Sequence, residues 1–193
     1  MARLNRRDAV GALLRDRRDL LAVAGLGSPV YDVFAAGDHA LNFYDWGAMG
    51  SAAMVGLGLA LARPGQPVVV FTGDGEMLMG LGAFATMAQH RPPNLSVVVL
   101  DNEQYAETGG QRTATAFGVD LADVARGCGI ADARTLDTMD QVRDLRADLH
   151  ARTRTLVRVL KIEPGDVPRS VPLKDGVAIK VRFAEALGRS GAP

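Results

Sequence analysis

Two short apolar stretches decide the fold: residues 67–72 (PVVVFT) and residues 95–100 (LSVVVL). The first is continuously apolar and rich in β-branched residues, a pattern typical of a strand buried on both faces of a parallel sheet, and we expect the second to be another buried strand. Gly73-Asp74-Gly75 follows the first stretch and Asp101-Asn102 follows the second, with a predicted helix over 76–90 between them. Ligands of such sheets bind outside the carboxyl ends of the strands, so we expect the two polar groups to lie side by side at one edge.

The alternation of strands and helices continues in both directions from these stretches. We expect strands over 20–24, near 134–136 and over 155–160, and a polar, glycine-containing loop over 103–117. We expect the remaining helices over 3–18, 28–37, 47–62, 120–128, 139–152 and 177–187. This pattern predicts an α/β fold with a parallel sheet flanked by helices. We expect a single domain over 1–193, with a core of about 6–160 and a C-terminal extension of about 161–193.

The composition excludes several classes of protein. The formal net charge is +0, from 22 basic and 22 acidic residues, which argues against a general nucleic-acid binder. A single cysteine, Cys128, excludes an internal disulfide framework and a four-cysteine zinc site. The longest apolar run, 52–62, is too short to span a bilayer, and the N-terminal residues lack the apolar segment of a secretory signal. We therefore expect a cytoplasmic protein with no nucleic-acid partner and no membrane partner.

The two polar groups carry the candidate chemistry. Asp74 offers a hard oxygen ligand, Asn102 offers a neutral one, and the backbone after Asn102 could offer a third. Oxygen ligands together with phosphate oxygens suit Mg²⁺, and the helix that follows Asp74 directs N–H groups toward an anion. The dinucleotide fingerprint lacks its third glycine here, and no phosphate-binding Gly-Lys-Ser/Thr motif occurs. The alternative that both groups are ordinary strand-to-helix turns stays open.

The arrangement of Gly73-Asp74-Gly75 and, one helix and one strand later, Asn102 resembles the signature of thiamine-diphosphate-dependent enzymes. Residues 42–50 (NFYDWGAMG) resemble the segment that meets the aminopyrimidine of this cofactor. Residues 108–111 (TGGQ) resemble a loop of sulfopyruvate and phosphonopyruvate decarboxylases. The similarity runs from about residue 6 to about residue 159. It implies the diphosphate-binding (PP-type) domain of a 2-oxo acid decarboxylase, which is a carboxy-lyase.

The resemblance also implies roles for individual residues. The side chains of Asp74 and Asn102 and the backbone carbonyl of Gln104 would hold Mg²⁺. The Met49 side chain would hold the cofactor in its bent conformation. The residues implied for cofactor binding are Gly37, Asp38, His39, Gly47, Ala48, Met49, Gly73, Asp74, Gly75, Glu76, Asn102, Gln104, Tyr105 and Ala106. Those implied for the substrate are Thr108, Gly109, Gly110 and Gln111. Many relatives carry a small residue at position 76, so we expect the Glu76 side chain to face solvent or a partner, away from the diphosphate.

The same resemblance predicts a partner chain. In the family, the activating glutamate lies in a separate pyrimidine-binding domain, and no second α/β domain is recognisable within the 193 residues. We therefore expect an α-type pyrimidine-binding subunit in an α2β2 or larger assembly, with the glycines of 47–62 close to that interface. The expected substrate is a 3-substituted pyruvate. The alternatives are a subunit of an oxidoreductase or of a carboligase or synthase, a non-catalytic cofactor-binding subunit, and an unrelated nucleotide-binding domain. The roles of His39 and Glu107 stay open.

Overall fold

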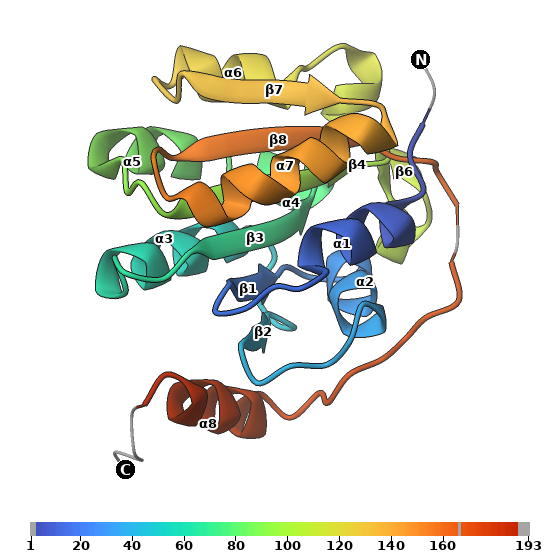
Figure 1. Ribbon diagram of the computed structural model, residues 1–193. Helices are drawn as coiled ribbons and strands as arrows, with labels where there is room; N and C mark the ends of the chain where they lie inside the picture. The colour runs from blue at the N-terminus through green and yellow to red at the C-terminus, as the bar shows by residue number, and fades with distance from the viewer. Residues whose placement is uncertain (1–2, 166, 189–193) are drawn as a thin grey trace.

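The computed structural model describes residues 3–165 and 167–188, and its main feature is a six-stranded sheet with the order β2-β1-β3-β4-β8-β7 (Figure 1). Every strand pair in this sheet is parallel, which confirms the predicted α/β fold. A separate antiparallel pair follows β4 and consists of β5 (Gln104–Tyr105) and β6 (Gln111–Arg112). The strands of the main sheet are β1 (Leu21–Ala24), β2 (Asn42–Tyr44), β3 (Val68–Gly73), β4 (Leu95–Asp101), β7 (Asp132–Leu136) and β8 (Leu156–Lys161).

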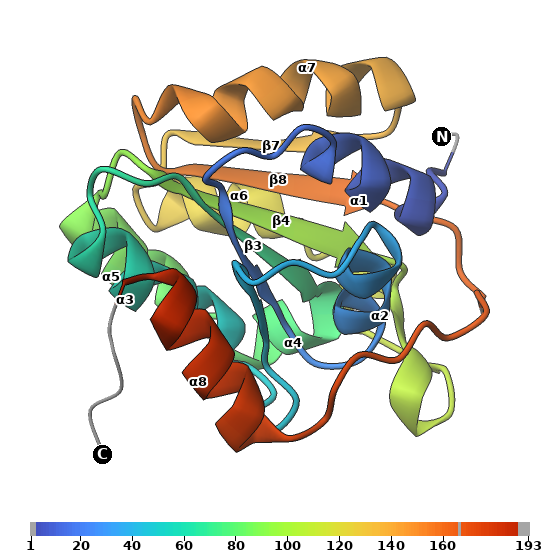
Figure 2. The same ribbon diagram turned by 60° about the horizontal axis from the view of Figure 1, so that its bottom comes forward.

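Helices cover both faces of the sheet (Figures 1 and 2). One face packs against α1 (Arg6–Leu14), α2 (Ser28–Ala35) and α7 (Met139–Ala151). The other face packs against α3 (Ala52–Ala62), α4 (Asp74–Met79), α5 (Ala83–His90) and α6 (Leu121–Gly127). After β8 the chain runs around the molecule to α8 (Gly176–Ala186), which lies beside β2 and packs Phe183 edge-on against Phe43 at 5.5 Å between ring centroids. No helix within the described ranges combines the length and the apolar character needed to cross a membrane.

The central strands are continuously apolar because both of their faces are buried. Val68 and Val70 belong to the core on the α3 side, whereas Val69 and Phe71 belong to the core on the α1 side. Successive side chains of a strand point to opposite faces, so a strand covered on both sides needs an apolar residue at every position. This burial is the physical origin of the PVVVFT pattern.

The predicted helix over 47–62 begins later, at Ala52. Gly50 has a φ of +94°, a backbone conformation that a right-handed helix does not contain, so residues 45–50 form a loop at the carboxyl edge of the sheet. Within the helix, a Cβ at Gly56 would lie 2.1 Å from Val70 Cγ2. The close packing predicted from this glycine is therefore real, but it is made with the chain's own sheet rather than with a partner.

The predicted helix over 76–90 is two helices, α4 and α5, which are interrupted after Met79. A Cβ at Gly80 would lie 2.3 Å from the carbonyl oxygen of Gly50. The loop 45–50 therefore packs directly onto the backbone of the helix break. This contact brings Met49, in the middle of the sequence segment 42–50, next to the Gly73-Asp74-Gly75 turn.

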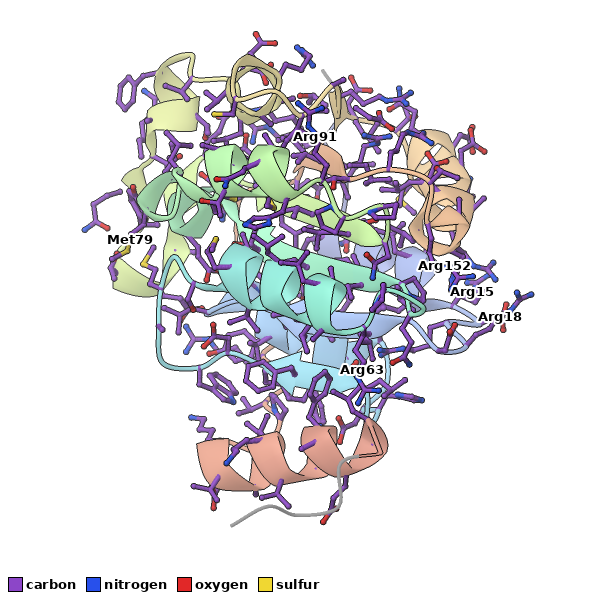
Figure 3. The ribbon with its side chains drawn as sticks, turned by 90° about the vertical axis from the view of Figure 1, so that its left-hand side faces the viewer. Arg15, Arg18, Arg63, Met79, Arg91 and Arg152 are labelled. Atoms are coloured by element: carbon purple, nitrogen blue, oxygen red, sulfur yellow. The ribbon has the colours of Figure 1, made fainter. Side chains whose placement is uncertain are left out.

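The opposite, amino edge of the sheet is rich in arginine. Four arginines are the C-cap residues of α1, α3, α5 and α7, and Figure 3 shows them from this side: Arg15, Arg63, Arg91 and Arg152. In a parallel α/β fold the helices run back from the carboxyl edge, so their C-terminal ends gather at the amino edge, where positive side chains are favourable. Arg91 donates to the carbonyl of Ala88 at 2.8 Å, and Arg63 donates to that of Leu187. The ends of four helices thus account for the gathering of these arginines at the amino edge.

Candidate functional site

A pocket lies at the carboxyl edge of the sheet, where β3 and β4 end. Its volume is about 110 Å³, and α2, the loop 45–50, α4 and the β5 segment surround it. Gly73 and Leu100 are register partners, so the two polar groups after β3 and β4 are neighbours, as the sequence predicts. The predicted site residues that line the pocket are Met49, Gly73, Asp74, Gly75, Glu76, Asn102, Gln104, Tyr105, Ala106 and Thr108. Glu107 lines it as well.

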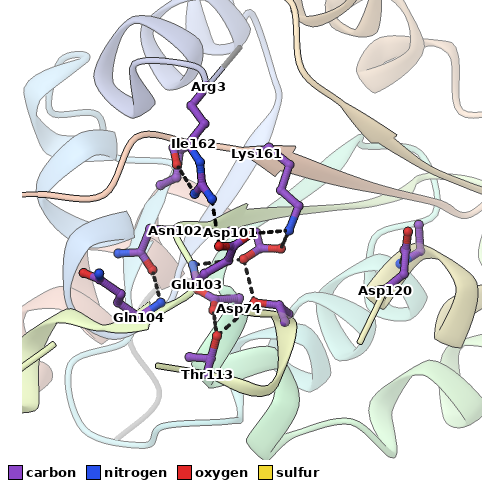
Figure 4. Close-up of polar contacts among 12 residues, drawn as sticks. Arg3, Asp74, Asp101, Asn102, Glu103, Gln104, Thr113, Asp120, Lys161 and Ile162 are labelled. Carbon is purple, nitrogen blue, oxygen red and sulfur yellow. Dashed lines mark hydrogen bonds and ion pairs between the residues drawn. The ribbon is translucent and has the colours of Figure 1, made fainter. Parts of the chain in front are cut away.

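Asp74 is a buried carboxylate, with 1% of the residue exposed. The Thr113 hydroxyl donates to its Oδ2 at 2.6 Å, and the Thr115 hydroxyl lies 3.2 Å from the same oxygen (Figure 4). No basic side chain in the described ranges forms an ion pair with it. Burial raises the pKa of Asp74 to about 6; the Thr113 hydrogen bond acts in the opposite direction and the Asp101 charge in the same one.

Asp101, the last residue of β4, is equally buried but has a cation. Lys161 Nζ lies 2.7 Å from Asp101 Oδ2, and the Thr115 hydroxyl lies 2.9 Å from Asp101 Oδ1. Thr115 therefore stands between the two carboxylates. Of these two, only Asp101 is neutralised by a lysine, Lys161 (Figure 4). A positive charge close to a buried carboxylate stabilises its ionised form. The Asp74 site thus fits a bound cation.

Asn102 and Gln104 offer the other oxygen atoms that could bind a metal ion at this site. The Gln104 N–H donates to Asn102 Oδ1 at 3.0 Å, so the side chain of Asn102 folds over the turn and lies at the pocket. Within residues 3–165 and 167–188, no three His, Cys, Asp or Glu side chains gather into a metal site. One carboxylate, one amide and a backbone carbonyl fit Mg²⁺ when phosphate oxygens supply further ligands, which is how this ion is commonly held.

Gly75 lies under the ring of Tyr105. A Cβ at position 75 would lie 2.4 Å from Tyr105 Cε1, far inside van der Waals contact. The second glycine of the Gly73-Asp74-Gly75 turn is therefore required by the packing of Tyr105, which brings β5 onto the first turn of α4. This contact closes one side of the pocket.

The expectation that Glu76 faces solvent or a partner is wrong. The residue is 4% exposed, and its Oε2 accepts a hydrogen bond of 2.8 Å from the Thr72 hydroxyl. Its Oε1 accepts one from the Gly50 N–H at 3.3 Å. The carboxylate occupies a space that Gly25 leaves free, since a Cβ there would lie 1.9 Å from Oε2. Burial raises the pKa of Glu76, while the Thr72 hydrogen bond acts against this.

The loop 45–50 is anchored at both ends. The Ser51 hydroxyl donates to Asp45 Oδ2 at 2.5 Å, and Glu76 holds the Gly50 N–H. Met49 lies at the pocket, whereas the adjacent Gly47 and Ala48 are exposed. The loop thus brings Met49 to the pocket and leaves Gly47 and Ala48 accessible beside it.

Three predicted cofactor residues lie elsewhere: Gly37, Asp38 and His39. They follow α2, which begins at the carboxyl edge and runs back to the amino edge, so they lie at the start of β2 rather than at the pocket. Asp38 accepts a hydrogen bond from the Tyr44 hydroxyl at 2.8 Å and pairs with Arg182 at 2.7 Å. His39 Nδ1 accepts the Leu41 N–H at 3.1 Å, a local backbone contact. The direction of α2 separates these residues from the diphosphate-binding turn.

The predicted substrate loop is exposed and touches the pocket at Thr108 only. The Gln111 side-chain amide donates to the Thr108 carbonyl at 3.0 Å, while Gly109 and Gly110 turn the chain between them. Other members of the site were not predicted from the sequence, because no motif distinguishes them from ordinary loop or strand residues. They are Arg3, Glu103, Thr113, Thr115 and Lys161.

Comparisons with known proteins identify the relatives of this chain. Residues 27–159 match the family model described as thiamine pyrophosphate enzyme, C-terminal TPP binding domain. The phosphonopyruvate decarboxylase of Streptomyces viridochromogenes is 42% identical over 150 residues, which are 78% of this chain and only 37% of that protein. The sulfopyruvate decarboxylase subunit beta of Methanocaldococcus jannaschii is 34% identical over 170 residues, 88% of this chain and 89% of that subunit. The structure of benzoylformate decarboxylase from Polynucleobacter necessarius shares the fold, with a TM-score of 0.69 and 20% identity over 86% of this chain and 34% of that one.

Proposed function

Because this chain belongs to the thiamine pyrophosphate enzyme family, as a C-terminal TPP-binding domain, we propose that it is the diphosphate- and Mg²⁺-binding subunit of a 2-oxo acid decarboxylase. The proposed substrate is a 3-substituted pyruvate that carries a sulfonate or a phosphonate. The observation that carries the proposal is the buried Asp74 carboxylate, which faces the pocket with two threonine hydroxyls and no basic partner in the described chain. The names of the relatives support the substrate class.

In this proposal Asp74, Asn102 and the Gln104 carbonyl hold Mg²⁺, which neutralises the diphosphate. The N–H groups of Gly75 and Glu76 donate to the diphosphate at the start of α4. Bound thiamine diphosphate supplies a nucleophilic carbon and an electron sink for the loss of carbon dioxide. The Gly47 carbonyl and the Met49 N–H bind the aminopyrimidine, and the Met49 side chain fixes the orientation of its two rings. Thr108, the Gly109 N–H, Gln111 and Arg112 face the anionic substituent of the substrate, whereas the Gly110 N–H donates to the Tyr105 carbonyl at 3.0 Å.

The proposal requires a partner subunit. Ligand pockets usually enclose roughly 300–1,000 Å³, whereas the pocket here has about 110 Å³. Such a pocket covers a diphosphate and its ion but leaves the rings to be enclosed by another surface. We assign that surface, together with the activating glutamate, to a pyrimidine-binding subunit in an α2β2 or larger assembly. The designation "subunit beta" of a relative that this chain matches over most of its length supports the assignment.

The test is to co-express the chain with a candidate pyrimidine-binding subunit from the same organism and to measure carbon dioxide release. Sulfopyruvate and phosphonopyruvate are offered beside pyruvate and bulkier 2-oxo acids, each with Mg²⁺ and thiamine diphosphate. We expect release from a 3-substituted pyruvate and none from the complex that carries Asp74→Ala. Release that requires an added oxidant or an acceptor aldehyde would instead identify an oxidoreductase or a carboligase. Release that Asp74→Ala leaves unchanged would contradict the proposed ion site.

A further inference from the structure

Glu103 has an unfavourable backbone conformation and lies between two residues of the proposed ion site. Its φ is +63°, in the left-handed region that non-glycine residues rarely adopt. It stands between Asn102 and Gln104, the two residues that offer neutral oxygens to the proposed ion. For a residue with a Cβ, the equilibrium between right-handed and left-handed backbone disfavours the left-handed conformation by about 5- to 30-fold. Something in the surrounding structure must therefore hold it there.

Two cations from separate elements hold the Glu103 carboxylate. Arg3 Nη2 lies 2.7 Å from Oε2, and Lys161 Nζ lies 3.1 Å from Oε1, so each oxygen has its own partner (Figure 4). Lys161 ends β8 opposite Asp101 in the register of the sheet. Arg3 also donates to the Ile162 carbonyl at 3.2 Å and precedes Leu4, which bridges to Ile162. The carboxylate is thus fixed to the rigid edge of the sheet.

The backbone of Glu103 is held as well. Its N–H donates to Asp101 Oδ1 at 3.1 Å, and its carbonyl accepts the Thr113 N–H at 3.1 Å. As a result the Glu103 side chain points toward β8, while Asn102 and Gln104 line the pocket and Glu103 does not. An extended residue at this position would separate the Gln104 N–H from Asn102 Oδ1, because this hydrogen bond closes a turn around residue 103.

We propose that Glu103 is a positioning residue, whose ion pairs with Arg3 and Lys161 keep residue 103 left-handed and thereby direct the Asn102 side chain and the Gln104 carbonyl to the ion that Asp74 binds. The inference rests on the proposed function for the identity of that ion. The left-handed conformation of Glu103 and its two ion pairs are found in the chain itself, without a ligand. Glycine adopts the left-handed region without penalty, so it should replace Glu103 better than alanine does.

The test compares Glu103→Ala with Glu103→Gly, and uses Glu163→Ala as a control that removes one exposed charge nearby. The first readout is the hydrogen exchange of the Gln104 amide in the ligand-free chain, since that N–H is bonded to Asn102 Oδ1. We expect exchange to rise about 10-fold in Glu103→Ala and about 3-fold or less in Glu103→Gly. Arg3→Ala, which leaves residue 103 unchanged, should raise it by an intermediate factor.

The second readout is the Mg²⁺ affinity of the partner-bound complex at saturating thiamine diphosphate. We expect this affinity to fall most in Glu103→Ala, less in Arg3→Ala and least in Glu103→Gly. Wild-type exchange at Gln104 in Glu103→Ala would overturn the proposal. So would equal effects of Ala and Gly, because the charge rather than the backbone would then matter. The proposed function fails separately, if Asp74→Ala binds Mg²⁺ and cofactor as the wild type does while the exchange results remain as expected.

Discussion

The Thr113 hydroxyl donates a hydrogen bond of 2.6 Å to Asp74 Oδ2, and no basic side chain of the described chain forms an ion pair with this carboxylate. A hydroxyl dipole stabilises a buried negative charge only in part. The buried carboxylate therefore fits a bound cation, and burial without one disfavours its ionised form. Sites built for function often lower stability in this way.

Asp74→Asn should stabilise the ligand-free chain and abolish Mg²⁺ binding. The amide keeps the shape of the carboxylate without its buried charge, so we expect the free energy of unfolding at pH 8 to rise by on the order of 1–3 kcal/mol. Urea denaturation of both chains measures this change. Asp120→Asn offers a poor comparison because Asp120 caps α6, so the exposed Asp144→Asn is the matched control. A loss of stability in Asp74→Asn would show that the carboxylate is satisfied without an ion.

Mg²⁺ binding should weaken as the pH falls below about 6, the raised pKa of Asp74. The ion displaces a proton from this carboxylate, so affinity should fall on the order of tenfold per pH unit below that value. The ligand-free chain should respond in the opposite direction. The stability that the protonated Asp74 contributes is complete below the ordinary pKa of 3.8 and is lost as the pH rises through about 6. Titrations of Mg²⁺ and of urea between pH 5 and pH 8 measure both trends, and parallel trends would contradict this assignment.

Glu76→Ala should destabilise the fold and loosen the loop 45–50. The variant leaves the buried Thr72 hydroxyl and the Gly50 N–H without their acceptor. An unsatisfied buried donor costs about 1–3 kcal/mol, and we expect Glu76→Gln to lose less because its amide oxygen can still accept. Urea unfolding measures the cost, with the exposed Glu185→Ala as the control. If Glu76 faced solvent or a partner, both variants would unfold like the wild type.

Gly75→Ala should be destabilising because of Tyr105, and Tyr105→Ala should relieve part of the effect. The added Cβ would lie 2.4 Å from the ring, an overlap that costs about 1–3 kcal/mol in a packed site. The free energies of unfolding of the two single variants and the double variant form a cycle that isolates this contact. Gly58→Ala, at another helical glycine with open space at its Cβ, is the matched control. Strict additivity in the cycle would show that the two residues do not meet.

The parts of the fold that the sequence predicts are those governed by local pattern. The doubly buried strands β3 and β4 are recognisable because runs of consecutive apolar residues make up most of each strand, and parallel topology then brings Asp74 and Asn102 to one edge. The three-residue strand β2 is too short for such a pattern. The late start of α3 and the break before α5 depend on the contact between Gly50 and Gly80, which come from separate segments.

The environment of the site is less accessible from the sequence, since distant residues create it. Glu76 is buried because Gly25, fifty-one positions earlier in the chain, leaves room for its carboxylate. The turn at Gly37, Asp38 and His39 resembles the Gly73-Asp74-Gly75 turn in composition, but it lies at the far end of α2. Only the direction of this helix reveals its position. Likewise the contrast between Asp74 and Asp101 depends on Lys161, which β8 brings beside β4.

The central claim, that this chain binds thiamine diphosphate through an ion held at Asp74, is tested most directly by equilibrium dialysis of the cofactor against the complex with the pyrimidine-binding subunit. The measurement is made with Mg²⁺ and with a chelator, for the wild type and for Asp74→Ala. We predict one bound cofactor per chain with Mg²⁺, and none with the chelator or in the variant. Cofactor binding that is independent of Mg²⁺, or equal in Asp74→Ala and the wild type, would contradict the claim.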